Sequence, residues 1–136
     1  MKLIDTDILI DFSHEIEAAE QFLETLRNNG EALAISAITP PLLWRGWGWV
    51  ELVEGCRNKR ELMKVIKFLG EFKLIHFSEQ ISQKAIELIE MYKLSHGLLI
   101  PDAIIAATAI MMNSELYSQN DRHFKMIKEL KVTKPY

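Results

Sequence analysis

Short apolar runs alternate along this chain with longer segments in which apolar residues recur every three or four positions. The apolar runs cover residues 2–4, 32–38, 73–77 and 115–118. Their length and composition predict buried strands, whereas the spacing in the longer segments predicts helices with one buried side. Strands that alternate with helices favour an α/β sandwich around a largely parallel sheet.

Local signals place the boundaries of the expected helices. Ser78 is expected to cap one helix, and Asn28-Asn29-Gly30 is expected to end another. The stretch 102–112 is almost uncharged, which predicts a buried helix. The expected helices cover residues 5–12, 15–28, 50–56, 60–70, 78–92, 102–112 and 124–130, and Val132 is expected in a last short strand.

Length and composition favour one ordinary globular domain. The 136 residues are read as a single domain, 1–136. The net charge of −3 gives no general attraction to nucleic acid, although five basic residues and one acid follow Asp121. One cysteine, Cys56, excludes an intramolecular disulfide and suits a reducing cytosol. The N-terminal apolar run is too short for a signal peptide, so we expect a soluble, cytoplasmic protein.

Four carboxylates stand out because each interrupts or flanks apolar sequence. Asp5 follows the first strand, Glu51 opens a helix, Asp102 opens the buried helix, and Asp121 follows the strand at 115–118. Ligands of parallel sheets bind beyond the carboxyl ends of the strands, where Asp5 and Asp121 are expected. Taken alone, Asp102 could be an acid favoured by the helix dipole, and Glu51 an ordinary surface residue.

Converging carboxylates predict a metal site. They repel one another unless a cation balances them, and all-oxygen ligands select Mg²⁺ or Mn²⁺ over zinc. Such ions activate water for phosphodiester hydrolysis. Asp7 and Asp11 are interpreted as structural hydrogen-bonding residues, and Thr6 as a helix cap or a partner of a metal-binding carboxylate. The sequence contains no zinc motif H-E-x-x-H and no glycine-rich phosphate loop.

The motifs that carry these acids occur in a familiar order. They read "LIDTDILIDF", "ISAIT…WVELVEG", "IPDAIIAATAI" and "YSQNDRHFKMI", followed by "LKVTKP". Together they resemble the PIN-domain nucleases, particularly the VapC-type toxins of toxin–antitoxin pairs. The similarity extends over nearly the whole chain.

This resemblance implies a three-layer α/β/α sandwich with a central, mainly parallel sheet of four to five strands. It implies a metal-dependent endoribonuclease whose catalytic and metal-binding acids fall on Asp5, Glu51 and Asp102, with a fourth at Asp121. It also implies a homodimer and a cognate VapB-type antitoxin that inserts into the acidic groove. Ser118, like Thr6, matches a position where the family often has a hydroxyl beside the acids.

The chain departs from the family pattern in two places. Nine residues, 40–48, stand between the second strand and the helix of Glu51, and they contain two of the three tryptophans. This insertion is expected to be an exposed loop packed by its own aromatic residues, or else a stacking surface for an unpaired RNA base or a patch that binds a partner. If it displaces Glu51, Glu54 is the substitute. The last acid is also ambiguous, because one alignment selects Asn120 and another selects Asp121.

Basic residues and rival families complete the sequence hypotheses. Arg57, Lys59 and Arg122 are candidates for contacts with the RNA backbone. A HAD-type phosphatase would explain Asp5-x-Asp7, but it expects Thr where this chain has Leu9. A receiver domain expects an Asp acceptor near mid-chain, where only glutamates are found. A catalytically degenerate PIN domain that binds RNA or protein is the alternative function.

Overall fold

The computed structural model describes residues 1–36 and 56–136. Strands and helices alternate along most of this length, as the sequence predicts. The strands are β1 (Lys2–Ile4), β2 (Leu33–Ser36), β3 (Lys73–Ile75), β4 (Glu115–Tyr117) and β5 (Val132–Thr133). The helices are α1 (Thr6–Ser13), α2 (Glu17–Asn28), α4 (Lys59–Leu69), α5 (Glu79–His96) and α6 (Ile100–Met111), with a 3₁₀ helix η1 (Asp121–His123).

The five strands form one sheet in the order β3-β2-β1-β4-β5, and all its strand pairs are parallel. β1 lies at the centre, with Leu3 opposite Ala34 of β2 and Leu116 of β4. This arrangement confirms the predicted parallel sheet. It also brings the carboxyl ends of β1 and β4 side by side, so the residues that follow these two strands are neighbours in space.

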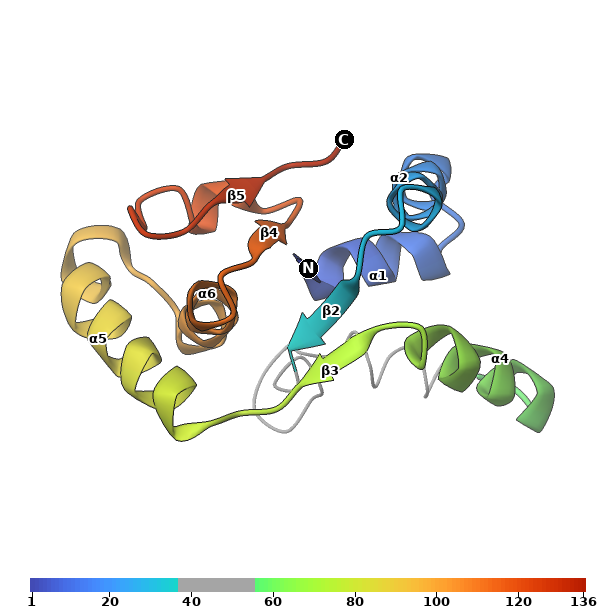
Figure 1. Cartoon of the computed structure of the whole chain (residues 1–136), viewed down its shortest axis with the longest axis horizontal. Coiled ribbons are helices and arrows are strands. Elements are labelled where there is room, and N and C mark those ends of the chain that lie inside the picture. The colour runs from blue at the N-terminus through green and yellow to red at the C-terminus, as the bar shows by residue number, and fades with distance from the viewer. Residues whose placement is uncertain (37–55) are drawn as a thin grey trace.

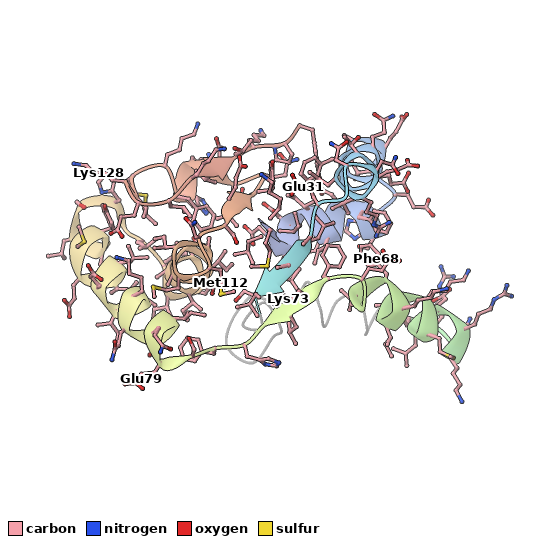
Figure 2. The ribbon with its side chains drawn as sticks, viewed as in Figure 1. Glu31, Phe68, Lys73, Glu79, Met112 and Lys128 are labelled. Atoms are coloured by element: carbon pink, nitrogen blue, oxygen red, sulfur yellow. The ribbon has the colours of Figure 1, made fainter. Side chains whose placement is uncertain are left out.

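Helices cover both faces of the sheet (Figure 1). One core joins α1, α2 and α4 to the sheet, and a second joins α5 and α6 to it. In the first core, Phe12 of α1 and Phe68 of α4 stack with ring centroids 4.4 Å apart. Phe68 is labelled in Figure 2. In the second, α6 is buried along almost its whole length, because α5 packs against it on the side away from the sheet. The three-layer α/β/α fold is therefore confirmed.

The predicted helix over 124–130 is wrong. Successive turns replace it: the amide of Ile127 donates to the carbonyl of Phe124, and the amide of Leu130 donates to that of Ile127. These apolar residues lie three positions apart, and all three are buried. A spacing of three suits three-residue turns, because it keeps every third side chain on the same side.

Some sequence predictions lie outside the described residues. These are the Trp-rich insertion at 40–48, the helix expected over most of 50–56, and the positions of Glu51 and Glu54. Within residues 1–36 and 56–136, no helix combines the length and apolar character needed to cross a membrane.

Candidate active site

Asp5 lies where β1 turns into α1. Its backbone amide donates to the carbonyl of Tyr117 at the end of β4, with a distance of 2.9 Å. Its carboxylate caps α1 by accepting a hydrogen bond of 2.8 Å from the amide of Thr6. The residue is only 8% exposed. The position of Asp5 is therefore fixed by β1, which it follows, by the backbone bond to β4, and by the bond of its carboxylate to the start of α1.

Ser118 connects Asp5 to the end of β4. Its hydroxyl is fully buried and donates to Oδ2 of Asp5 at 2.8 Å. The same hydroxyl lies 3.2 Å from Oδ2 of Asp7, and it accepts a hydrogen bond from the amide of Asn120. Ser118 therefore lies beside the acids, where the family resemblance places a hydroxyl. Thr6, by contrast, bonds Asp5 through its backbone amide.

Asp7 holds the turn that follows β4. Its Oδ2 accepts hydrogen bonds from the amides of Gln119 (2.9 Å) and Asn120 (3.2 Å), and from the side-chain amide of Asn120 (3.2 Å). Its Oδ1 is buried and has no hydrogen-bond partner among the described residues. Asp11 accepts a hydrogen bond from the hydroxyl of Tyr136. Both aspartates hydrogen-bond to distant segments rather than to their own turns, and a purely structural role for them stays a prediction.

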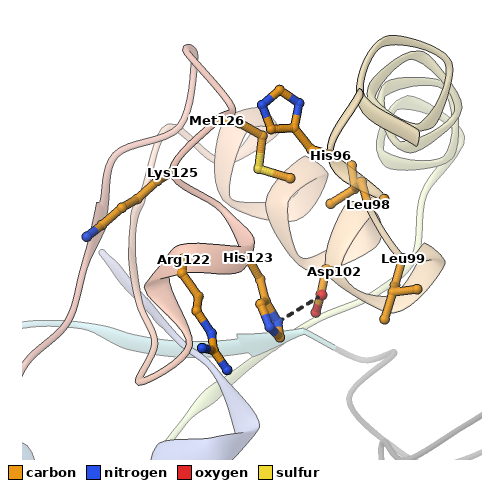
Figure 3. A pocket seen from close by; sticks show the side chains of 9 residues that line it. His96, Leu98, Leu99, Asp102, Arg122, His123, Lys125 and Met126 are labelled. Carbon is orange, nitrogen blue, oxygen red and sulfur yellow. Dashed lines mark ion pairs between the residues drawn. The ribbon is translucent and has the colours of Figure 1, made fainter. Parts of the chain in front are cut away.

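Asp102 lies in the first turn of α6, directly after Pro101. Its side chain is 20% exposed, and its Oδ2 lies 3.4 Å from Nδ1 of His123 (Figure 3). Its negative charge is close enough to raise the pKa of Asp5. Acids separated by almost a hundred residues therefore influence each other, as the convergence of carboxylates requires.

Surplus negative charge marks this edge of the sheet. The pKa of Asp5 is raised to about 7, mainly because the carboxyl is buried and then because Asp7 is negatively charged. Hydrogen bonds from Ser118 and Thr6 act in the opposite direction. Burial also raises the pKa of Asp7 and of Asp102, and in Asp102 the neighbouring His123 opposes that shift. Three carboxyls thus hold protons more tightly than isolated carboxyls do.

Asn120 and Asp121 have different surroundings. Asn120 belongs to the hydrogen-bonded group around Asp7 and Ser118. Asp121 begins η1, and its carboxylate lies 2.7 Å from the ammonium of Lys125, which lowers the pKa of Asp121. The structure therefore brings Asn120 into the cluster and pairs Asp121 with a cation. The role of either residue toward a metal stays a prediction.

Comparison with known proteins gives the family. A family model described as PIN domain matches residues 2–130 of this chain. This chain belongs to the PIN-domain family. "Ribonuclease VapC19" of Mycobacterium tuberculosis is 35% identical over 131 residues, which are 96% of this chain and 97% of the relative.

Solved structures agree with this assignment. A "Toxin-antitoxin complex from Klebsiella pneumoniae" contains a chain that is 32% identical, with a TM-score of 0.76, and the match covers 100% of this PIN domain and 98% of that chain. "VapBC2 from Rickettsia felis bound to a DNA fragment from their promoter" contains a chain that is 26% identical, with a TM-score of 0.71. That match covers 97% of this chain and 96% of the other.

The carboxylates of this PIN domain fit a divalent cation in charge and in donor type. Two of the predicted ligands, Asp5 and Asp102, are electrostatically coupled, and carboxylate oxygens are the donors that Mg²⁺ and Mn²⁺ prefer. Among residues 1–36 and 56–136, no three acid, histidine or cysteine side chains are placed to hold one ion together. Glu51, the third predicted ligand, lies outside the described residues, so its part in a metal site stays a prediction.

The three basic candidates for RNA contact lie in different places. Arg57 and Lys59 lie at the start of α4, in the helical layer opposite α5 and α6 (Figure 1). Arg122 follows Asp121 in η1 and lines a pocket together with Asp102. Among the candidate-site acids that the structure describes, Asp102 shares this pocket with Arg122.

Sequence reasoning missed His123 and the part that Asp7 plays in the acid cluster. His123 contacts Asp102 and lies in the motif "YSQNDRHFKMI", but a single histidine beside an arginine gave no separate signal. Asp7 had a signal in the spacing Asp5-x-Asp7. In an extended strand such spacing puts two side chains on one side, whereas here Asp5 caps the helix in which Asp7 lies.

Proposed function

We propose that this PIN domain is an endoribonuclease that hydrolyses RNA with the help of Mg²⁺ or Mn²⁺, and that it is the toxin of a VapBC-type pair. The supporting observation is the pair Asp5 and Asp7 after β1, hydrogen-bonded to Ser118 after β4, with Asp102 of α6 close enough for its charge to raise the pKa of Asp5. The relatives named as VapC ribonucleases support the same activity.

The residues of the site have separate tasks in this proposal. Asp5 and Asp102, with Glu51, hold the metal. Ser118 and the amide of Thr6 keep Asp5 in one orientation, since each bonds a different carboxylate oxygen. Asp7 keeps the turn at residues 118–120 against α1, which fixes the hydroxyl of Ser118 in turn.

A bound divalent ion lowers the pKa of water and stabilises charge on the phosphate oxygens. In the proposed reaction, the oxygen of water bonds to phosphorus and the bond from phosphorus to O3′ breaks. O3′ takes up a proton, so the products carry a 5′-phosphate and a 3′-hydroxyl. The chain's own part is to present the carboxylates and to orient the phosphodiester. The pKa of Asp5, raised to about 7, means that a nearby cation would favour its ionised form.

RNA cleavage with and without metal tests the proposed activity. We expect cutting of a structured RNA in Mg²⁺ or Mn²⁺, and a loss of at least about a hundredfold in Asp5→Asn and Asp102→Asn, because each replaces a metal-binding charge by a neutral amide. Asp11→Asn is the matched control, since it makes the same change in the same helix but at a carboxylate bonded to Tyr136. Undiminished cutting by both site variants would contradict the proposal.

Calorimetric titration with Mn²⁺ distinguishes the alternative. A catalytically degenerate PIN domain that only binds RNA or protein predicts no Mn²⁺ binding, whereas the nuclease predicts binding that Asp5→Asn weakens. The raised pKa of Asp5 adds a signature, because metal binding at pH 6.5 must displace a proton and so release heat that varies with the buffer.

We also propose a homodimer and a VapB-type antitoxin as partners. The solved relatives titled as a toxin-antitoxin complex and as VapBC2 support the antitoxin. Large apolar side chains that stay exposed on α4 and α5 support the presence of protein partners in general.

A further inference from the structure

The turn and the 3₁₀ helix that follow β4 contact three acids of the candidate site in sequence order. Ser118, at the start, donates to Asp5, and the two backbone amides that come next donate to Asp7. Further along, Nδ1 of His123 lies 3.4 Å from Oδ2 of Asp102. One short segment therefore carries a polar partner for each of the three carboxylates.

The backbone around His123 is fixed. Its amide donates to the carbonyl of Asn120, and the amide of Phe124 donates to the carbonyl of Asp121, each at 2.9 Å. The ring of Phe124 is fully buried and anchors the end of η1 in the core. The imidazole of His123 therefore projects from a well-supported position beside the first turn of α6.

The nearby charges leave His123 and Asp102 to each other. Asp121, the acid of η1, lies 2.7 Å from the ammonium of Lys125. In the part of the chain that the structure describes, Asp102 forms an ion pair with His123 and has no other side-chain partner. Figure 3 shows the imidazole and the carboxylate facing each other across this contact.

A single donor on one oxygen suits a carboxylate that also binds a metal ion. A carboxylate has two oxygens with about four acceptor positions, so a bond to Oδ2 leaves most of them open. An uncharged imidazole donates from the nitrogen that carries its proton, which must be Nδ1 for this contact to be a hydrogen bond. Carboxylates that ligate metals are commonly held by such a partner, which limits their rotation.

We propose that His123 is a positioning residue, which donates from Nδ1 to Oδ2 of Asp102 and holds that carboxylate in one orientation for a divalent ion. The proposal rests on the proposed metal-dependent function, and it gives His123 no contact with the ion or with RNA. Because the side chain of His123 is 43% exposed, its replacement is expected to weaken metal binding without unfolding the protein.

Mn²⁺ binding in the absence of RNA tests this role. The free ion is measured by electron paramagnetic resonance at pH 8, where Asp5, with a pKa of about 7, is mostly ionised. His123→Phe keeps a ring but removes the donor, and we expect it to raise the Kd for Mn²⁺ about tenfold. His123→Asn keeps an N–H near the place of Nδ1, and we expect it to restore most of the affinity.

His96→Phe is the matched control. His96 lines the same pocket as Asp102, but its Nδ1 lies 2.7 Å from the hydroxyl of Ser95. We expect the Kd for Mn²⁺ to stay unchanged in this variant. Thermal unfolding in EDTA checks the fold, and His123→Phe is expected to unfold within about 2 °C of the wild type.

Three results would overturn the role of His123. If the wild type binds Mn²⁺ and His123→Phe binds it equally well, the positioning role is wrong and the proposed function stands. If His123→Asn binds as weakly as His123→Phe, or if both unfold at a clearly lower temperature, His123 acts as a ligand or as a structural residue instead. If the wild type itself binds no Mn²⁺, the metal-dependent function fails together with this inference.

Discussion

At the scale of single residues, the site combines strong positioning with unfavourable electrostatics. Asp5 is buried, accepts two hydrogen bonds and faces the negative charges of Asp7 and Asp102. Without a cation, such an arrangement lowers the stability of the folded protein, because the folded state resists ionisation of Asp5. The raised pKa of about 7 reflects this loss of stability. It leads to a prediction about unfolding that can be tested without measuring catalytic activity.

Asp5→Asn is expected to stabilise the metal-free protein at alkaline pH. Because the pKa of Asp5 in the folded state is about 7, above the 3.8 of an isolated carboxyl, the wild type loses stability as the pH rises from about 4 through 7. Asparagine still caps α1 but does not ionise. The gain in unfolding free energy at pH 8 should exceed the gain at pH 5 by about 2 kcal/mol.

Thermal or urea unfolding in EDTA at both pH values measures this difference. Asp11→Asn serves as the control, because its carboxylate lies on the same helix and bonds Tyr136 instead of facing the acids. A gain for Asp5→Asn that is the same at pH 5 and pH 8, or a loss at pH 8, would contradict the assigned pKa of Asp5.

The residues also indicate which parts of the site could be predicted from the sequence. Asp5 and Asp102 could be predicted as site residues because each adjoins strongly apolar sequence. A carboxylate in such a place is costly to bury, which indicates a functional role. Asn120 and Asp121 are not separable in the same way, because the short turns after β4 decide which side chain points inward. His123 acquires its contact only when η1 and α6 meet, and no local pattern encodes that meeting.

At the scale of elements, the alternation of strands and helices could be predicted because the spacing of apolar residues in the sequence agrees with the side chains that are buried in the structure. β1 and β2 are short and almost entirely buried, and α6, whose one charged residue is Asp102, lies between the sheet and α5. The failure at 124–130 has a physical cause: a spacing of three satisfies both a helix and a series of turns, and tertiary packing of Phe124 and Ile127 decides between them. Element types could therefore be predicted best where apolar runs were long or uninterrupted.

One acid at the amino end of β4 bonds side chains from both neighbouring strands. Glu115 begins β4, opposite Lys2 of β1, and it accepts a hydrogen bond of 2.6 Å from Thr133 of β5. Its Oε2 also lies 2.9 Å from the ammonium of Lys2 and 3.3 Å from that of Lys131. Burial raises the pKa of Glu115, but the bonds from Thr133 and the lysines outweigh it and lower the pKa to about 2.

Glu115→Gln is expected to destabilise the protein at neutral pH by about 1 kcal/mol, a modest value because solvent screens the lysines. The folded pKa of about 2 lies below the usual 4.5, so the stabilisation is complete above pH 4.5 and is lost as the pH falls from there toward 2. Urea unfolding at pH 7 and pH 3 should therefore show a smaller effect of the substitution at pH 3. Glu129→Gln is the control, because the side chain of Glu129 is 51% exposed in its ion pair with Lys84. We expect this substitution to change the free energy of unfolding little. An equal loss at both pH values would instead indicate a packing effect.

At the scale of the whole molecule, two helices in different helical layers each expose several large apolar side chains. α4 exposes Met63 and Ile66, at 61% and 56%. α5 exposes Ile86 at 57%, Met91 at 54% and Leu94 at 100%. A stable interface buries about 800 Å² on each partner, which a long helix with three apolar side chains supplies more readily than a shorter one with two. We therefore expect copies of this chain to associate through α5.

Light scattering tests this assignment with a matched pair of variants. The wild type is expected at 31.4 kDa, twice the 15.7 kDa of one chain. Leu94→Asp should give the monomer, because it places a charge in the interface, whereas Ile66→Asp should leave the dimer intact and serves as the control. A monomeric Ile66→Asp beside a dimeric Leu94→Asp would move the interface to α4, and a wild type of 15.7 kDa at high protein concentration would exclude the homodimer itself.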